Sequence, residues 1–266
     1  IPIRITATLT QISLLIMIPC LRTLLQTQGM HGNCKALLIT SGLLQLAILV
    51  VQEAHFVHNF ITDNRIHAGG KPQKPFAATQ NGLFIISSCM SLMLLLERTY
   101  AVWNCAKYEK TSMHFLPLST LIGISILVGA LGVYGLYWPN MKVELIIVVY
   151  VMEGCTFLLS IAIIVYARSK LRLMPYNEDR LKSKYQVKEV LNFSLAILPS
   201  VFVSAIMHTL SLVPTLLWIG GTIDYPLDCL FYYSVTILNC ILTKLTLIGF
   251  HKGMRQRFLL LFVSKL

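Results

Sequence analysis

The stretch Leu145–Ala167, LIIVVYVMEGCTFLLSIAIIVYA, contains one charged residue, Glu153, in an otherwise apolar or weakly polar run. An α-helix needs about 20 mostly apolar residues to cross the hydrocarbon core of a bilayer, which is about 30 Å thick. The stretch meets this requirement and therefore predicts a membrane-spanning helix.

Similar stretches recur along the whole chain, and most of them carry no charge. No small-residue cleavage pattern with a soluble domain after it follows the first stretch, which favours a span over a signal peptide. The chain opens at Ile1 without an initiator Met, so we expect the first helix to lack part of its beginning. The pattern predicts an all-α membrane protein, a single seven-helix domain over residues 1–266, with spans at about 4–25, 36–58, 76–103, 114–138, 143–168, 190–218 and 226–250.

The composition agrees with a membrane protein. Hydrophobic residues make up 56% of the chain, charged residues 12%, and the mean hydropathy is +0.70. The charged share is about half that of a soluble domain, which excludes a disordered chain and argues against a cytosolic enzyme. The net charge of +11 then indicates how the chain is oriented in the membrane, rather than nucleic-acid binding.

The distribution of Lys and Arg predicts the orientation, because short cytoplasmic loops carry the excess of these residues. With the N-terminus outside, most of the 22 Lys and Arg residues fall on the cytoplasmic side. Those left outside are Arg4, Arg65, Lys71, Lys74 and Lys142. We therefore expect a multi-pass plasma-membrane protein with its N-terminus outside and its C-terminus inside.

Ionisable residues at membrane depth are candidates for function, because burying them costs a few kcal/mol. At about 1.5 Å per residue, Glu153 lies roughly 15 Å below the start of its span, close to the midplane. Polar groups on several helices at one depth would line a cavity open to the exterior, with bonds between helices as the alternative role. The candidate ligand-binding residues are Glu53, Gln80, Glu153, His208, Asp228 and Tyr232, and His55, His58, Asn81 and Tyr233 lie near them in the outer half.

The sequence contains no catalytic motif. His55 and His58 form H-x-x-H, but a metal needs three or four converging ligands and the other histidines are scattered. A Gly-x-Ser-x-Gly elbow, a phosphate-binding Gly-rich loop and paired mid-membrane carboxylates are all missing. We therefore expect no metal, no cofactor and no enzyme. Lys244 is expected close to the inner face, with its ammonium reaching the headgroups.

Glu97 and Arg98 close the third span, and counting from Phe76 places Arg98 about 33 Å along it, at the inner surface. An ion pair there could change partner when neighbouring helices move, forming a two-state element. Contact between Arg98 and lipid phosphates is the alternative. Pro199 permits a kink in the sixth span, which could be a hinge or a static bend.

The residues after the last span, Phe250–Phe262, place Met254, Phe258, Leu261 and Phe262 on one face of a helix. Lys252, Arg255 and Arg257 lie off that face. This pattern predicts an amphipathic helix at 251–263 on the inner membrane surface, suited to anionic lipid or an acidic partner.

Several of these residues resemble a known family. Seven spans, Glu97-Arg98 closing the third and a surface helix after the seventh are similar to a G-protein-coupled receptor. More narrowly, the chain resembles nematode serpentine chemoreceptors of the Sre class, within the Sra superfamily. Asn239–Thr243 (NCILT) replaces the Asn-Pro-x-x-Tyr of rhodopsin-like receptors. The matching stretches are His31-Gly-Asn33, Glu97-Arg98-Thr-Tyr100-Ala101, Tyr108-Glu109 and Tyr185-Gln186-Val-Lys-Glu189.

The resemblance implies a receptor that detects environmental chemicals in sensory neurons and their cilia. Its partners would be a small-molecule ligand, the α subunit of a heterotrimeric G protein and the lipid bilayer, with no nucleic acid. The residues assigned to coupling and switching are Glu97, Arg98, Tyr100, Tyr185, Gln186, Glu189 and Pro199. A seven-helix transporter is the alternative; a membrane enzyme such as a fatty-acid elongase would need a histidine box that is missing.

Overall fold

The fold is known from a computed structural model, which describes residues 2–27, 30–61, 73–108, 115–136, 142–174 and 181–263. Every regular element in these ranges is an α-helix, as the sequence predicts. The helices are α1 (Pro2–Gln26), α2 (Gly32–Ile61), α3 (Gln73–Trp103), α4 (Cys105–Tyr108), α5 (Phe115–Leu136), α6 (Lys142–Leu173), α7 (Leu181–Ile219), α8 (Tyr225–Phe250) and α9 (Lys252–Val263).

Six of the described helices are long and apolar enough to cross a membrane: α1, α2, α3, α6, α7 and α8. The chain is therefore a helical bundle of the multi-pass membrane type. The prediction of seven spans is met only in part, because the apolar part of α5 described in full is the shorter segment Leu118–Tyr134.

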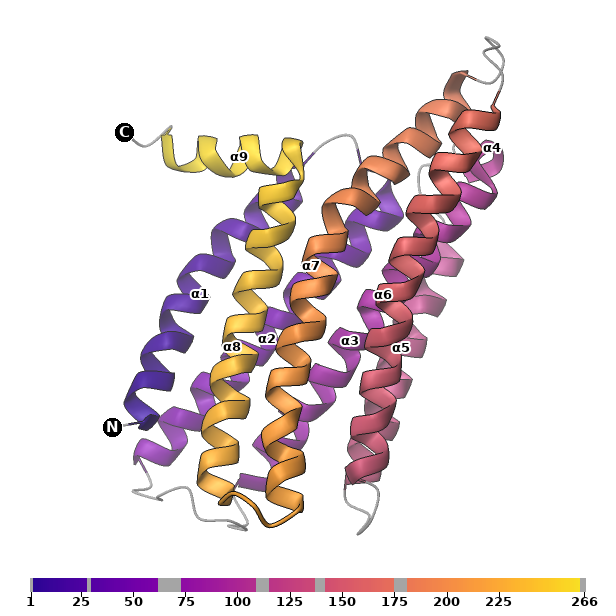
Figure 1. Cartoon of the computed structure of the whole chain (residues 1–266). Coiled ribbons are helices and arrows are strands. Elements are labelled where there is room, and N and C mark those ends of the chain that lie inside the picture. Colours follow the sequence, from indigo (N-terminus) through magenta and orange to yellow (C-terminus); the bar gives the residue numbers. More distant parts are fainter. Residues whose placement is uncertain are drawn as a thin grey trace.

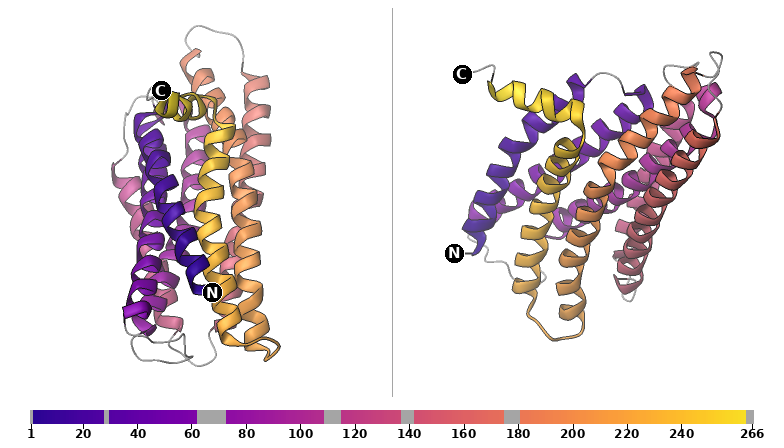
Figure 2. Two further views of the ribbon diagram at one scale, coloured as in Figure 1. Left: turned by 90° about the vertical axis from the view of Figure 1, so that its left-hand side faces the viewer. Right: turned by 45° about the horizontal axis from the view of Figure 1, so that its top comes forward.

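The long helices run side by side and alternate in direction along the chain (Figure 1). The beginning of α1 lies at one end of the bundle, which we call the Asp228 end, and α9 lies at the other, which we call the Arg98 end. Figure 2 shows α9 lying across the Arg98 end, at a steep angle to α8. Helix α3 is central, because it packs against α2, α5, α6 and α7.

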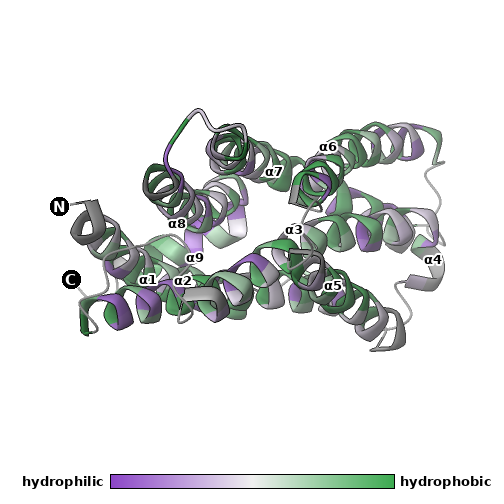
Figure 3. Cartoon of the chain, turned by 90° about the horizontal axis from the view of Figure 1, so that it is seen from below, coloured by the Kyte–Doolittle hydropathy of each residue, from purple (hydrophilic) through white to green (hydrophobic). Residues whose placement is uncertain are grey.

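The outward faces of the bundle are apolar and its interior contains polar side chains, the reverse of a soluble protein. On α6, Val151, Leu158 and Val165 recur every two turns and are exposed, whereas Glu153, Thr156 and Ser160 face inward and are buried. Most residues of α5, α6 and α7 are hydrophobic when the bundle is seen along its axis (Figure 3). Such a surface is suited to contact with lipid. The buried polar residues make the interior the candidate location of a functional site.

Helix α7 is longer than the sequence predicts. It begins at Leu181 rather than near 190, so the basic segment with Lys184 and Lys188 is helical and not a loop. Pro199 and Pro214 both lie inside α7, which continues through them to Ile219. The helix thus extends beyond the bilayer thickness, and its first turns belong to the Arg98 end.

Candidate functional site

The interior of the bundle contains a hydrogen-bonded group formed by Glu153 on α6, His208 on α7 and Asn239 on α8. Glu153 Oε1 lies 2.6 Å from His208 Nδ1, and Asn239 Nδ2 lies 2.8 Å from His208 Nε2. The three residues are 5%, 4% and 5% exposed. This group, called the central triad below, joins three helices through one imidazole ring.

The bonding pattern indicates the protonation of His208. An amide nitrogen can only donate, so Asn239 Nδ2 donates to a bare Nε2, and the ring proton is on Nδ1, where the Glu153 carboxylate accepts it. Protonation of Nε2 would require the Asn239 amide to flip, so that Oδ1 accepts instead. Glu153 Oε2 and Asn239 Oδ1 have no hydrogen-bond partner, which leaves acceptors available for such a rearrangement or for a ligand.

Aromatic side chains connect the triad to other predicted ligand-binding residues. Phe84 on α3 presents its ring edge to His208, with centroids 4.5 Å apart, and its centroid lies 6.1 Å from that of Tyr232. The Tyr232 hydroxyl donates to Asn81 Oδ1 at 2.8 Å. Tyr232 therefore lies beside the triad, as the prediction of a common site requires.

Gln80 belongs to a neighbouring polar contact between α2, α3 and α8. Its Nε2 lies 3.4 Å from Gln52 Oε1, and Gln52 Nε2 donates to the Tyr233 carbonyl at 3.2 Å. Both Gln side chains are buried. These bonds match the alternative role for inward polar residues, which is to hold helices together.

Glu53 and Asp228 make separate pair contacts, and the structure gives neither a bond to the triad. Glu53 Oε1 accepts a hydrogen bond from Gln11 of α1 at 2.9 Å, and Asp228 Oδ1 accepts one from Thr215 of α7 at 2.9 Å. Of the six predicted residues, Glu153 and His208 are hydrogen-bonded to each other, and Tyr232 lies next to them. These contacts do not bring all six residues together around one cavity.

A polar cavity of about 40 Å³ lies between α2, α3, α6, α7 and α8. Among the six predicted ligand-binding residues only Glu153 lines it, together with hydroxyl side chains from all five of these helices. Lys244 on α8 also lines this cavity, is only 6% exposed and donates to Ser41 of α2 at 3.2 Å. The expectation that its ammonium reaches the headgroups is wrong, because the side chain turns inward towards α2.

At the Arg98 end, Glu97 and Arg98 form the predicted ion pair. Arg98 Nε lies 2.6 Å from Glu97 Oε2, and one terminal nitrogen lies 2.8 Å from Glu97 Oε1. The same guanidinium nitrogen donates to the Tyr108 hydroxyl at 2.9 Å, and that hydroxyl donates to Glu97 Oε1. Arg98 is 1% exposed. The expectation that it emerges at the inner surface is therefore wrong, and so is the alternative that it contacts lipid phosphates.

Burial accounts for the role of Tyr108. Burial raises the pKa of its phenol, so the hydroxyl retains its proton and donates to Glu97 while accepting from Arg98. The guanidinium carbon also lies 5.8 Å from the Tyr108 ring centroid and 5.7 Å from that of Phe193 on α7. Arg98 is thus held by a carboxylate and by two aromatic rings from different elements.

Residues near the beginning of α2 complete this group. The His31 ring packs on Tyr108 with centroids 3.9 Å apart, and the His31 backbone N–H donates to Glu189 of α7 at 3.3 Å. The residues His31, Glu97, Arg98, Tyr108, Glu189 and Phe193, called the Arg98 cluster below, come from the approach to α2 and from α3, α4 and α7. Glu109, next to Tyr108 in its motif, lies outside the described residues.

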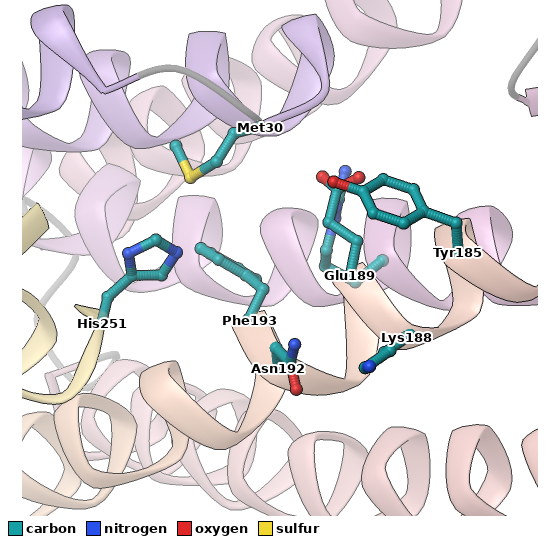
Figure 4. Close-up of a pocket in the computed structure, with 8 residues that line it drawn as sticks. Met30, Tyr185, Lys188, Glu189, Asn192, Phe193 and His251 are labelled. Atoms are coloured by element: carbon teal, nitrogen blue, oxygen red, sulfur yellow. The ribbon is translucent and has the colours of Figure 1, made fainter. Parts of the chain in front are cut away.

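A second cavity, of about 230 Å³, opens beside the Arg98 cluster and is lined by Arg98 and by residues of α7. Figure 4 shows Phe193 and His251 facing each other, Met30 beside them, and Glu189 next to Tyr185. Among the other predicted coupling residues, Tyr185 is largely exposed and lines this cavity, and Tyr100 is partly exposed. Gln186 is buried, with its Nε2 unpartnered.

Neither Asn239 nor Tyr108 is among the site residues predicted from the sequence. A signal for Asn239 exists, because Asp228, Tyr232, Thr236, Asn239 and Thr243 recur every three or four residues and so share one face of α8. Comparison with known proteins adds nothing to this: no protein-family model and no curated protein matches the chain.

Proposed function

We propose that this protein is a seven-helix G-protein-coupled chemosensory receptor of the plasma membrane, with the Asp228 end outside. A small molecule is detected at the central triad, and a heterotrimeric G protein is engaged at the Arg98 end. The observation that carries the proposal is the Arg98 cluster, because the four stretches that resemble Sre-class receptors each contribute a residue to it. The stretches begin at His31, Glu97, Tyr108 and Tyr185.

The two sites share α7, which supports a coupling between them. His208 of the triad and Glu189 and Phe193 of the Arg98 cluster all lie on this one helix. A ligand that bonds Glu153 or His208 better in one arrangement of α7 shifts the population towards it. An arrangement that draws Glu189 and Phe193 away from His31 and Arg98 opens the cavity beside them to the G-protein α subunit.

Pro199 lies on α7 between the triad and the Arg98 cluster. A proline removes one intrahelical hydrogen bond, so the helix is easier to bend there than elsewhere. This supports the hinge role that the position of Pro199 in its span predicts. The exposed Tyr100 and Tyr185 then offer contacts to the G protein at the rim of the opened cavity.

The experiment is a second-messenger assay in cells that express the chain at the surface, challenged with a chemical library. A compound that raises the signal is then tested on Arg98→Met, which should abolish coupling at unchanged surface expression. Arg172→Met removes an exposed Arg near the end of α6 and serves as the matched control. Coupling that survives unchanged in Arg98→Met removes Arg98 from the mechanism.

Because Arg98 is buried, its loss also leaves Glu97 unpaired and could impair folding. Glu189→Gln keeps the size of the side chain, weakens the contact with the His31 backbone and removes the attraction between the Glu189 carboxylate and Arg98. It should raise the basal signal without added compound, since α7 is then less restrained. Flux of a library compound into vesicles, with no second-messenger response in cells, would instead favour the transporter alternative.

A further inference from the structure

Lys244 lies in the bundle interior without a carboxylate partner. Contacts within 4.0 Å between basic and acidic side chains in the described part of the chain join Arg98 to Glu97 and His208 to Glu153, and none includes Lys244. The bond of Lys244 that the structure gives runs to the Ser41 hydroxyl. An ammonium has three N–H groups, so two remain for another acceptor. An uncompensated buried charge is costly, and a counter-charge within reach would remove much of that cost.

The cavity beside Lys244 has a size that limits what could supply this counter-charge. A single water needs roughly 10–15 Å³ of such space, so about 40 Å³ has room for about three water-sized atoms. The wall of the cavity also carries hydroxyl groups. The hydroxyl-bearing residues that line the cavity are Ser41, Ser87, Ser91, Thr156, Ser200, Ser204 and Thr243.

Most of these hydroxyls are already donating to a carbonyl. Thr156, Ser91 and Thr243 donate to backbone oxygens within their own helices, and Ser200 donates to the carbonyl of Thr243. Lys244 is therefore the strongest donor that faces the cavity with unused capacity. Glu153 lines the same cavity, but it bonds to His208 and lies more than 4.0 Å from Lys244.

We propose that this cavity is a binding site for a small monovalent anion of the size of chloride or formate, with Lys244 as its counter-ion. The two spare N–H groups of Lys244 donate to the anion, and the neighbouring hydroxyls surround it. Glu153 opposes binding by repulsion, so its pairing with His208 sets how tightly the anion is held. The proposal does not require receptor activity, although Glu153 belongs both to this cavity and to the central triad.

The test measures thermal unfolding of the purified full chain in detergent, in sodium chloride against sodium gluconate at the same ionic strength. Gluconate is too large for the cavity, and equal ionic strength removes differences in screening. At a chloride concentration about ten times the dissociation constant, the unfolding temperature should rise by about 3 °C. Formate should act like chloride.

Two variants distinguish a bound anion from a structural role of Lys244. Lys244→Met should abolish the difference between chloride and gluconate, whereas Lys252→Met, an exposed lysine of α9, should leave it unchanged. Glu153→Gln removes the repulsion while an amide oxygen still accepts from His208, so the chloride concentration for half-maximal effect should fall several-fold. If Lys244 has only a structural role, Glu153→Gln should not change how the unfolding temperature depends on the anion.

A direct measurement covers the case in which Lys244→Met does not fold. Crystals of the wild-type chain grown with bromide should show anomalous scattering in the cavity, within hydrogen-bond distance of Lys244 Nζ. Equal unfolding temperatures in chloride and gluconate, or crystals without bromide at Lys244, would overturn the proposal.

Discussion

Asn239 contacts His208 at Nε2, on the opposite side of the ring from the contact between Nδ1 and Glu153. Asn239→Leu would leave His208 Nε2 buried without a donor, while the branching of the side chain and its number of non-hydrogen atoms stay the same. A buried polar atom that loses its partner costs about 1–3 kcal/mol, which for a chain of this size lowers the unfolding temperature by roughly 2–5 °C. Thermal unfolding in detergent measures this.

Asn192→Leu is the matched control for that prediction. Asn192 lies on α7 with an exposed side chain, so its replacement should shift the unfolding temperature far less. An equal loss in both variants would mean that Asn239 contributes helix propensity or solubility and has no specific role at His208.

His251 lies between α8 and α9, and we expect it to make the free energy of unfolding depend on pH. Its Nδ1 accepts from the Met254 backbone at 3.2 Å, and burial lowers its pKa. As the pH falls through the ordinary histidine range of about 6.5, the unfolded chain binds a proton that the folded chain does not, so stability decreases. The wild type should lose more stability between pH 7 and pH 5 than His251→Gln, whose side-chain oxygen can still accept from Met254. Equal losses would exclude His251 as the source.

At the scale of the elements, α5 is held to α3 by close approach at glycines. A Cβ placed on Gly129 would lie 2.1 Å from Ile86 Cγ1 and 3.2 Å from the Gly82 carbonyl oxygen. Gly129→Ala should therefore force the helices apart and cost about 1–3 kcal/mol, seen as a lower unfolding temperature. Gly123→Ala on the same helix meets nothing within 4 Å and should be neutral or slightly stabilising.

Ile86→Ala combined with Gly129→Ala provides a second check on this contact. The smaller side chain removes the nearer clash, so part of the stability lost in Gly129→Ala should return. A double variant that is as unstable as the sum of the two single variants would show that Ile86 and Gly129 do not interact.

The helices themselves could be predicted because charge-free runs fix where a membrane helix can lie. The start of α7 could not, because Lys184, Lys188 and Glu189 are good helix formers that a search for apolar runs passes over. Counting about 1.5 Å per residue places Glu153 near the midplane of its own span and His208, counted from Asn192, in the outer third of the next span, although their side chains bond. Helix tilt and length beyond the bilayer both shift such counts.

Rotation about the helix axis explains the error at Lys244. Counting residues gives its depth but not its direction, and snorkelling assumes a side chain at the lipid face. Ile237, Cys240, Lys244 and Leu247 recur at helical spacing, and all are buried, so Lys244 lies on the inner face of α8. The helix face on which a charged residue lies therefore predicts the direction of its side chain better than its distance from the helix end does.

For the whole molecule, α5 decides the topology. Six crossings would return the C-terminus to the side of the N-terminus, whereas seven place the two on opposite sides. Helix α5 has 22 residues without a charge, about 33 Å of helix, and runs along α3 in the bundle (Figure 1). The first turn of α1 and helix α9 also lie at opposite ends of the bundle, as an odd number of crossings requires.

We therefore expect an epitope fused before Ile1 to be labelled by antibody in intact cells, and one fused after Leu266 only after permeabilisation. Exchanging the two epitopes controls for the antibodies, and a cytosolic marker protein controls for leaky cells. The basic residues gathered around α9 and the beginning of α7 are expected to keep the Arg98 end in the cytosol. Labelling of both ends in intact cells, or of neither, would mean an even number of crossings. The Arg98 cluster and the ligand site could then not serve opposite sides of the membrane through α7.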